Sequence, residues 1–76
     1  MADSPTAETA TTPLGHKLRQ LREGRGWSRE TLARKAGTTP LTILRAEVHG
    51  TSPTLASLQA WAGALNVPVS ELVDPE

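Results

Sequence analysis

One short segment, running from Ser28 to Glu47, constrains the path of the backbone more than its length suggests. Its informative residues are Ala33, Gly37 and Ile43. Alanine lets two helices approach closely, glycine ends a helix in the left-handed conformation without the steric cost of a Cβ atom, and isoleucine supplies a bulky apolar side chain for a core. The segment therefore predicts two short helices joined by a tight turn at Gly37, with Ile43 anchoring the second helix.

The length and composition limit the chain to one small domain. A chain of 76 residues buries only about 60% of its unfolded surface and has room for a single core. The absence of cysteine excludes disulfides and thiolate metal sites, and His16 and His49 have no partners at ligand spacing. We therefore expect no metal and no cofactor. The sequence has no apolar run of about 18 residues and no signal peptide, which predicts a cytoplasmic protein without a membrane segment.

The charges are unevenly distributed along the chain. The net charge is zero, with eight Lys and Arg against eight Asp and Glu. All eight basic residues lie between Leu14 and Leu72, where only four acidic residues occur, and eight minus four leaves +4. The other acids, Asp3, Glu8, Asp74 and Glu76, lie near the ends. The zero net charge thus conceals a basic module, and acidic ends screen such a module only partly.

Local start and stop signals predict five helices and no strand. Thr12, Ser28, Thr39 and Thr54 are candidate N-caps, and proline follows two of them at the first helical position. The predicted helices span residues 13–25, 29–36, 40–48, 55–65 and 69–73. Residues 1–12 have no large apolar side chain after Met1, which predicts a disordered tail before the domain at 13–73, and 74–76 form a C-terminal end.

Two stretches carry a family resemblance. Residues 14–37, LGHKLRQLREGRGWSRETLARKAG, and 52–72, SPTLASLQAWAGALNVPVSEL, resemble the Cro/CI-type (XRE-like) helix-turn-helix domains of phage repressors and bacterial regulators. The resemblance implies an all-α, five-helix lambda-repressor-like domain that acts as a sequence-specific transcriptional regulator and places residues 40–48 in the major groove of double-stranded DNA. It also implies a structural ion pair between Arg22 and Glu47 and a core position for both Trp27 and Trp61.

The resemblance further assigns candidate DNA contacts. The polar readers of bases are Arg45 with Thr39 or Thr42, while Lys17, Arg29 and the loop around Thr51 would hold phosphates. The complete set of DNA-binding residues implied by the resemblance is Lys17, Arg29, Thr39, Pro40, Leu41, Thr42, Leu44, Arg45 and Thr51. We expect that the chain is not an enzyme, because the sequence lacks a Ser/His/Asp set, a paired-carboxylate cleft and a glycine-rich phosphate loop.

The apolar residues Leu41, Leu44 and Val48 stand where the family usually has polar side chains, and three interpretations stay open. In the first interpretation the helix is still a DNA reader, with Leu41 or Leu44 touching thymine methyl groups. Alternatively, the three residues form a protein-binding patch, which would make the chain an adaptor or anti-regulator. In the third interpretation a small rotation buries Leu44 and Val48 and turns Ala46 outward.

The resemblance leaves the class of regulator and its assembly open. Phage repressors, antitoxins and restriction-modification controllers all fit the motifs, and so do both repression and activation. Many such domains bind half-sites as dimers. We place the expected homodimer surface around Val67, Val69, Leu72 and Val73.

Overall fold

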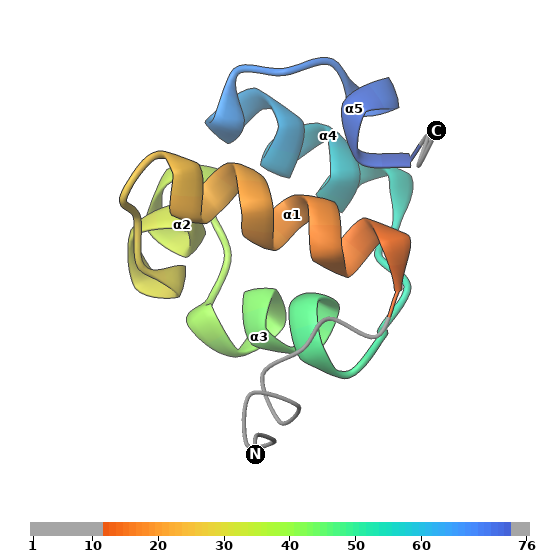
Figure 1. Ribbon diagram of the computed structural model, residues 1–76, viewed down its shortest axis with the longest axis horizontal. Coiled ribbons are helices and arrows are strands. Elements are labelled where there is room, and N and C mark those ends of the chain that lie inside the picture. The colour runs from red at the N-terminus through yellow and green to blue at the C-terminus, as the bar shows by residue number, and fades with distance from the viewer. Residues whose placement is uncertain (1–11, 74–76) are drawn as a thin grey trace.

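The chain folds into five helices within residues 12–73, the part that this computed structural model describes (Figure 1). The elements are α1 Pro13–Gly24, α2 Arg29–Ala36, α3 Pro40–Val48, α4 Leu55–Leu65 and α5 Val69–Val73. The predicted all-α, five-helix class is confirmed, although α1 ends one residue earlier than predicted, with Arg25 as its C-cap. The predicted tail, apart from Thr12, and the C-terminal end at 74–76 lie outside the described residues.

Side-chain caps set the start of the first four helices. The hydroxyls of Thr12, Ser28, Thr39 and Thr54 each accept a hydrogen bond from the backbone amide three residues later. Such a cap stabilises a helix by about 1 kcal/mol because it pairs an amide that the helix itself leaves unpaired. At the other end of α2, Gly37 adopts the left-handed conformation with φ 72°, which confirms the predicted tight turn.

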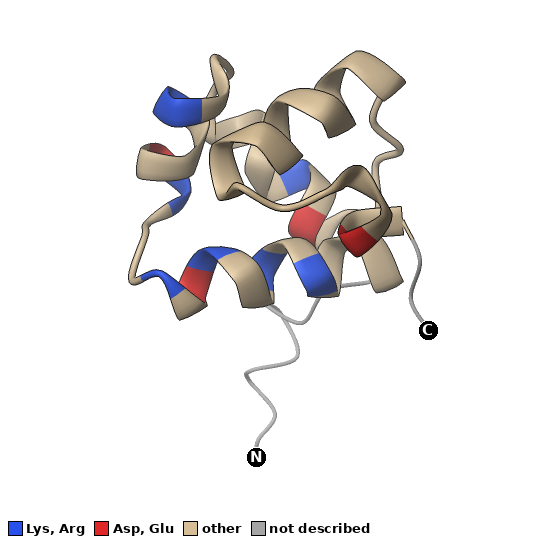
Figure 2. Cartoon of the chain, turned by 90° about the horizontal axis from the view of Figure 1, so that it is seen from above, with Lys and Arg blue, Asp and Glu red and all other residues tan. Residues whose placement is uncertain are grey.

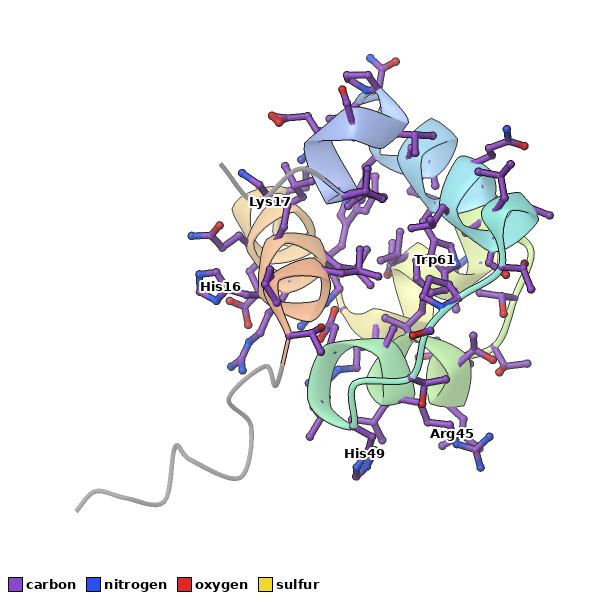
Figure 3. All side chains as sticks on the ribbon, turned by 90° about the vertical axis from the view of Figure 1, so that its right-hand side faces the viewer. His16, Lys17, Arg45, His49 and Trp61 are labelled. Carbon is purple, nitrogen blue, oxygen red and sulfur yellow. The ribbon has the colours of Figure 1, made fainter. Side chains whose placement is uncertain are left out.

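The core draws side chains from every helix. Its buried members are Leu18, Leu32, Ala33, Ile43, Ala46, Trp61, Ala62, Leu65 and Leu72. Ile43 is 0% exposed, as expected for the residue that anchors α3, and Figure 3 shows the Trp61 ring in the interior. α1 packs against α3 on one side and α5 on the other, while α2 bridges α3 and α4. This arrangement leaves α3 along one edge of the domain (Figure 1).

The two tryptophans differ in burial, so the prediction that both belong to the core is only partly right. Trp61 is 2% exposed, whereas Trp27 is half-buried at the margin of the core. Two cations cover the Trp27 ring: Lys35 Nζ lies 5.0 Å and Arg25 Cζ 5.8 Å from its centroid. Arg25 also donates to the carbonyl oxygens of Leu21 and Leu65. These contacts hold the turn after α1 against the end of α4.

Candidate nucleic-acid interface

A rigid turn positions α3 on α2. The backbone amide of Thr38 donates to the carbonyl of Ala33 at 2.9 Å across the left-handed Gly37. Ala33 on α2 and both Ile43 and Ala46 on α3 are at most 2% exposed, and the two helices pack against each other. Because the turn is short and the contact is close, α3 has a defined orientation with its outer side toward solvent.

The outer side of α3 combines three apolar side chains with one arginine. Leu41 is 50% exposed and Arg45 is also exposed, while Leu44 and Val48 are half-buried. At about 100° per residue, these four positions fall within one face of an α-helix. The interpretation that turns Ala46 outward is wrong, because Ala46 is 2% exposed and faces the core. The apolar residues therefore remain available to a partner.

The electrostatics of α3 favour an anionic partner. Arg45 and His49 both project away from the domain on the side where α3 lies (Figure 3). Glu47 is the only acid of α3 and is 0% exposed. Elsewhere, Lys and Arg gather on α1 and α2, and α4 carries none (Figure 2). The exposed face of α3 thus has positive charge and no carboxylate.

A buried ion pair joins α3 to α1. Arg22 Nε donates to Glu47 Oε2 at 2.7 Å, and its Nη2 donates to Oε1 at 3.1 Å. The remaining nitrogen, Nη1, donates to the carbonyl of Trp27 at 2.8 Å. The structure therefore brings together the two residues that the resemblance paired. This two-pronged contact limits rotation of α3 about its axis, since the carboxylate must face α1 for both bonds to form.

Arg29 is a second partner of the same carboxylate, which the sequence analysis missed. Its Nε donates to Glu47 Oε1 at 3.0 Å, and its side chain is 24% exposed. Arg29 was assigned to a DNA phosphate, and that contact stays a prediction. In the structure the residue connects the start of α2 to α3. The only signal of this contact in the sequence was the positive charge of Arg29 at the first position of α2.

The other candidate contacts fall into two groups. Thr39, Pro40, Thr42 and Thr51 lie on α3 or in the segments directly before and after it. Thr39 Oγ1 caps α3 and lies 3.0 Å from Thr42 Oγ1, so both hydroxyls already have a structural role. Lys17 lies on the side of α1 away from α3 (Figure 3), and the structure does not bring it to the face that carries Arg45.

The expected dimer residues are not equally accessible. Val73 is 50% exposed, Val67 and Val69 are half-buried, and Leu72 is 2% exposed within the core. Leu72 therefore cannot contribute contact area without unfolding α5, and the prediction that places it on a dimer surface is wrong.

The sequence analysis did not single out Leu55, which is 64% exposed at the start of α4.

Metal-ligating residues do not cluster within residues 12–73. None of the helices in that range has the length and apolar character that a membrane crossing requires.

Comparisons with known proteins agree with this geometry. The helix-turn-helix family model matches residues 18–72. The HTH-type transcriptional regulator SutR of Escherichia coli K12 is 40% identical over 62 residues, which is 82% of this chain and 35% of SutR. The chain thus spans about a third of that relative.

Two crystal structures have a similar fold. The restriction-modification controller protein C.AhdI from Aeromonas hydrophila has a TM-score of 0.76 and 27% identity, and the match covers 92% of this chain and 98% of the controller. A hypothetical transcription factor from Neisseria, NHTF, also has a TM-score of 0.76 and 27% identity, with coverage of 93% and 76%.

Proposed function

Because this chain belongs to the helix-turn-helix family, we propose that it is a sequence-specific DNA-binding transcriptional regulator of the Cro/CI class and not an enzyme. The observation that carries the proposal is the outer face of α3, where exposed Arg45 projects from a helix whose only carboxylate is buried. The major groove is about 12 Å wide and admits such a helix. The regulator would act in the cytoplasm by occupying an operator and excluding or recruiting polymerase.

The proposed contacts divide into base readers and phosphate holders. Arg45 is the proposed guanine reader, since a guanidinium matches the O6 and N7 acceptors of guanine with two parallel hydrogen bonds. Arg29 and Thr51 flank α3 and are the proposed phosphate contacts, which position the helix without reading sequence. Lys17, on the other side of α1 (Figure 3), would reach only a phosphate beyond the groove that α3 occupies.

A fluorescence-anisotropy titration tests this function directly. The labelled duplex would be the region upstream of the gene, with a scrambled duplex as the control, at several salt concentrations. Preferential binding of the upstream duplex, with affinity falling steeply as salt rises, is the expected result because phosphate contacts release counterions. If neither duplex binds with a dissociation constant below about 100 μM, the edge of ordinary non-specific affinity, the proposal is wrong.

Replacing Arg45 with alanine is expected to reduce the preference for the specific duplex by about 1–3 kcal/mol, the discrimination that one bidentate base contact provides. The titration above, repeated with both duplexes, measures this preference. Arg34→Ala is the matched control, because it removes the same charge from an exposed position in the last turn of α2. If the ratio of the affinities for the two duplexes were unchanged in Arg45→Ala, Arg45 would not be a base reader.

The second candidate function is a protein-binding adaptor or anti-regulator. The observation in its favour is the exposure of Leu41, together with half-buried Leu44 and Val48, on the same face. Clustered exposed apolar side chains often mark a protein interface. This function would be preferred if the chain failed to bind either duplex in the titration.

We also propose that the chain dimerises through α5 and the segment before it. The similarity to a restriction-modification controller is compatible with a controller function. Phage repressors and antitoxins are the alternative classes of regulator. Val67, Val69 and Val73 are the accessible apolar residues there. Two copies would then meet half-sites about 34–36 Å apart.

Val73→Glu is expected to convert a dimer into a monomer in sedimentation equilibrium at high protein concentration. A carboxylate at this half-exposed position would be costly to bury at an interface, whereas in the monomer it stays in water. Leu55→Glu is the control at an exposed leucine on α4. A wild-type chain that sediments as a monomer would contradict the dimer.

A further inference from the structure

We infer that α3 reads the 5-methyl groups of pyrimidines on either side of the guanine bound by Arg45. This inference rests on the proposed function and specifies the DNA that would be recognised. Its target is a short step in which guanine is flanked by thymine, or by 5-methylcytosine, which presents the same methyl group in the major groove.

The geometry of α3 supports the inference. Leu41, Arg45 and Val48 stand at positions i, i+4 and i+7 of one helix, so they form a single line along its outer face. With a rise of about 1.5 Å per residue, the leucine lies about 6 Å before the arginine and the valine about 4.5 Å after it. Successive base pairs are about 3.4 Å apart. With α3 lying along the groove, the apolar side chains would fall within about two base pairs of the guanine.

The chemistry of the groove leaves one apolar feature for these side chains to contact. The other base edges in the major groove present hydrogen-bond donors and acceptors, while the C5-methyl group of thymine is apolar. A leucine placed over a donor or acceptor would remove its water without supplying a hydrogen bond. Leu41 and Val48 therefore favour a C5-methyl group over the smaller C5–H of an unmethylated pyrimidine at their positions.

The charge pattern favours DNA over a protein as the occupant of this face. A helix that docks into a protein groove usually presents apolar anchors at i, i+3, i+4 and i+7. Here Leu41, Leu44 and Val48 occupy the i, i+3 and i+7 positions, but the i+4 position is Arg45, which interrupts the apolar residues, and the only acid of α3 is buried. The described residues also carry four more basic than acidic side chains, eight against four. A cationic, interrupted apolar face is complementary to methyl groups within a polyanion.

The test removes single methyl groups from the DNA. A specific site is first selected from a pool of random duplexes, and each thymine is then replaced by deoxyuracil, which differs only in the missing methyl group. Replacement within two base pairs of the essential guanine is expected to weaken binding about fourfold, the effect of burying one methyl-sized group. Replacement of a flanking cytosine by 5-methylcytosine is expected to strengthen binding by a similar factor.

Leu41→Ala links the effect to α3. Because Leu41 is half-exposed, the variant is expected to keep its fold, which a thermal melt would check. It should bind thymine and deoxyuracil equally at one position and keep the wild-type ratio at the others. Leu55→Ala, at an exposed leucine on α4, should change none of these ratios.

Two outcomes would overturn the inference and are distinguishable. A selected site that binds tightly, tolerates deoxyuracil at every thymine and requires guanine would exclude methyl reading but leave the proposed function intact. A pool from which no preferred sequence emerges would exclude both, and the apolar face would then be assigned to a protein partner.

Discussion

Replacing Arg22 with alanine is expected to lower the free energy of unfolding by about 3–5 kcal/mol, as found when one partner of a buried ion pair is removed. The variant would leave Glu47, which is 0% exposed, without the two bonds from Arg22, and the Trp27 carbonyl without its donor. A domain of about 60 residues has a total stability of only about 3–9 kcal/mol. Urea titration, followed through the fluorescence of Trp27 and Trp61, measures the loss.

Arg29→Ala is the matched control for this experiment. Arg29 contacts the same carboxylate through Oε1 but is 24% exposed, so we expect its removal to cost about 1 kcal/mol. Glu47 would keep both bonds from Arg22. A loss below about 1 kcal/mol for Arg22→Ala would show that Arg29 alone can neutralise the buried carboxylate, and the ion pair would lose its structural role.

Features that act over three or four residues could be read from the sequence. Thr12, Ser28, Thr39 and Thr54 were predicted as N-caps because a hydroxyl at that position accepts a bond from an amide three residues later, whatever the rest of the chain does. The left-handed turn at Gly37 follows for the same reason. These signals account for the start of the first four helices and for the end of α2.

Features that depend on which helices meet could not be read in this way. The bond from Arg29 to Glu47 joins residues 18 positions apart, and neither side chain identifies the other as its partner. Trp27 occupies a position that suggested the core, but its ring is only half-buried and lies beside the cations of Arg25 and Lys35. Both outcomes depend on the packing of α2, which no local pattern specifies.

The candidate DNA-binding face illustrates the same division. Helical periodicity places Leu41, Arg45 and Val48 on one face, but periodicity alone does not decide whether that face or the one containing Ala46 points inward. The structure settles the rotation through Glu47 and Ala46, which are buried against α1 and the core. The inner side of α3 is thus occupied by Ile43, Ala46 and Glu47, which Arg22 holds, and the face with Leu41 and Arg45 lies on the opposite, outer side.

Gly15→Ala is expected to destabilise the domain by about 2 kcal/mol, although alanine is the better helix former. A Cβ atom at this buried position would lie 2.6 Å from the carbonyl oxygen of Ala46 and 2.9 Å from that of Glu47. Both atoms belong to the α3 backbone and cannot rotate away, so the cost lies near the upper end of the roughly 1–3 kcal/mol typical of overpacking. The gain in helix propensity offsets about 1 kcal/mol of it.

Gly63→Ala separates the two contributions to this result. Gly63 also lies within a helix, but an added Cβ atom there would have no neighbour within 4 Å, so we expect stabilisation by about 0.5–1 kcal/mol. Urea titrations of the two variants should therefore give changes of opposite sign. If Gly15→Ala stabilised the domain as well, α1 and α3 would have room to separate, and the close approach of the two backbones at Gly15 would not help to set the orientation of α3.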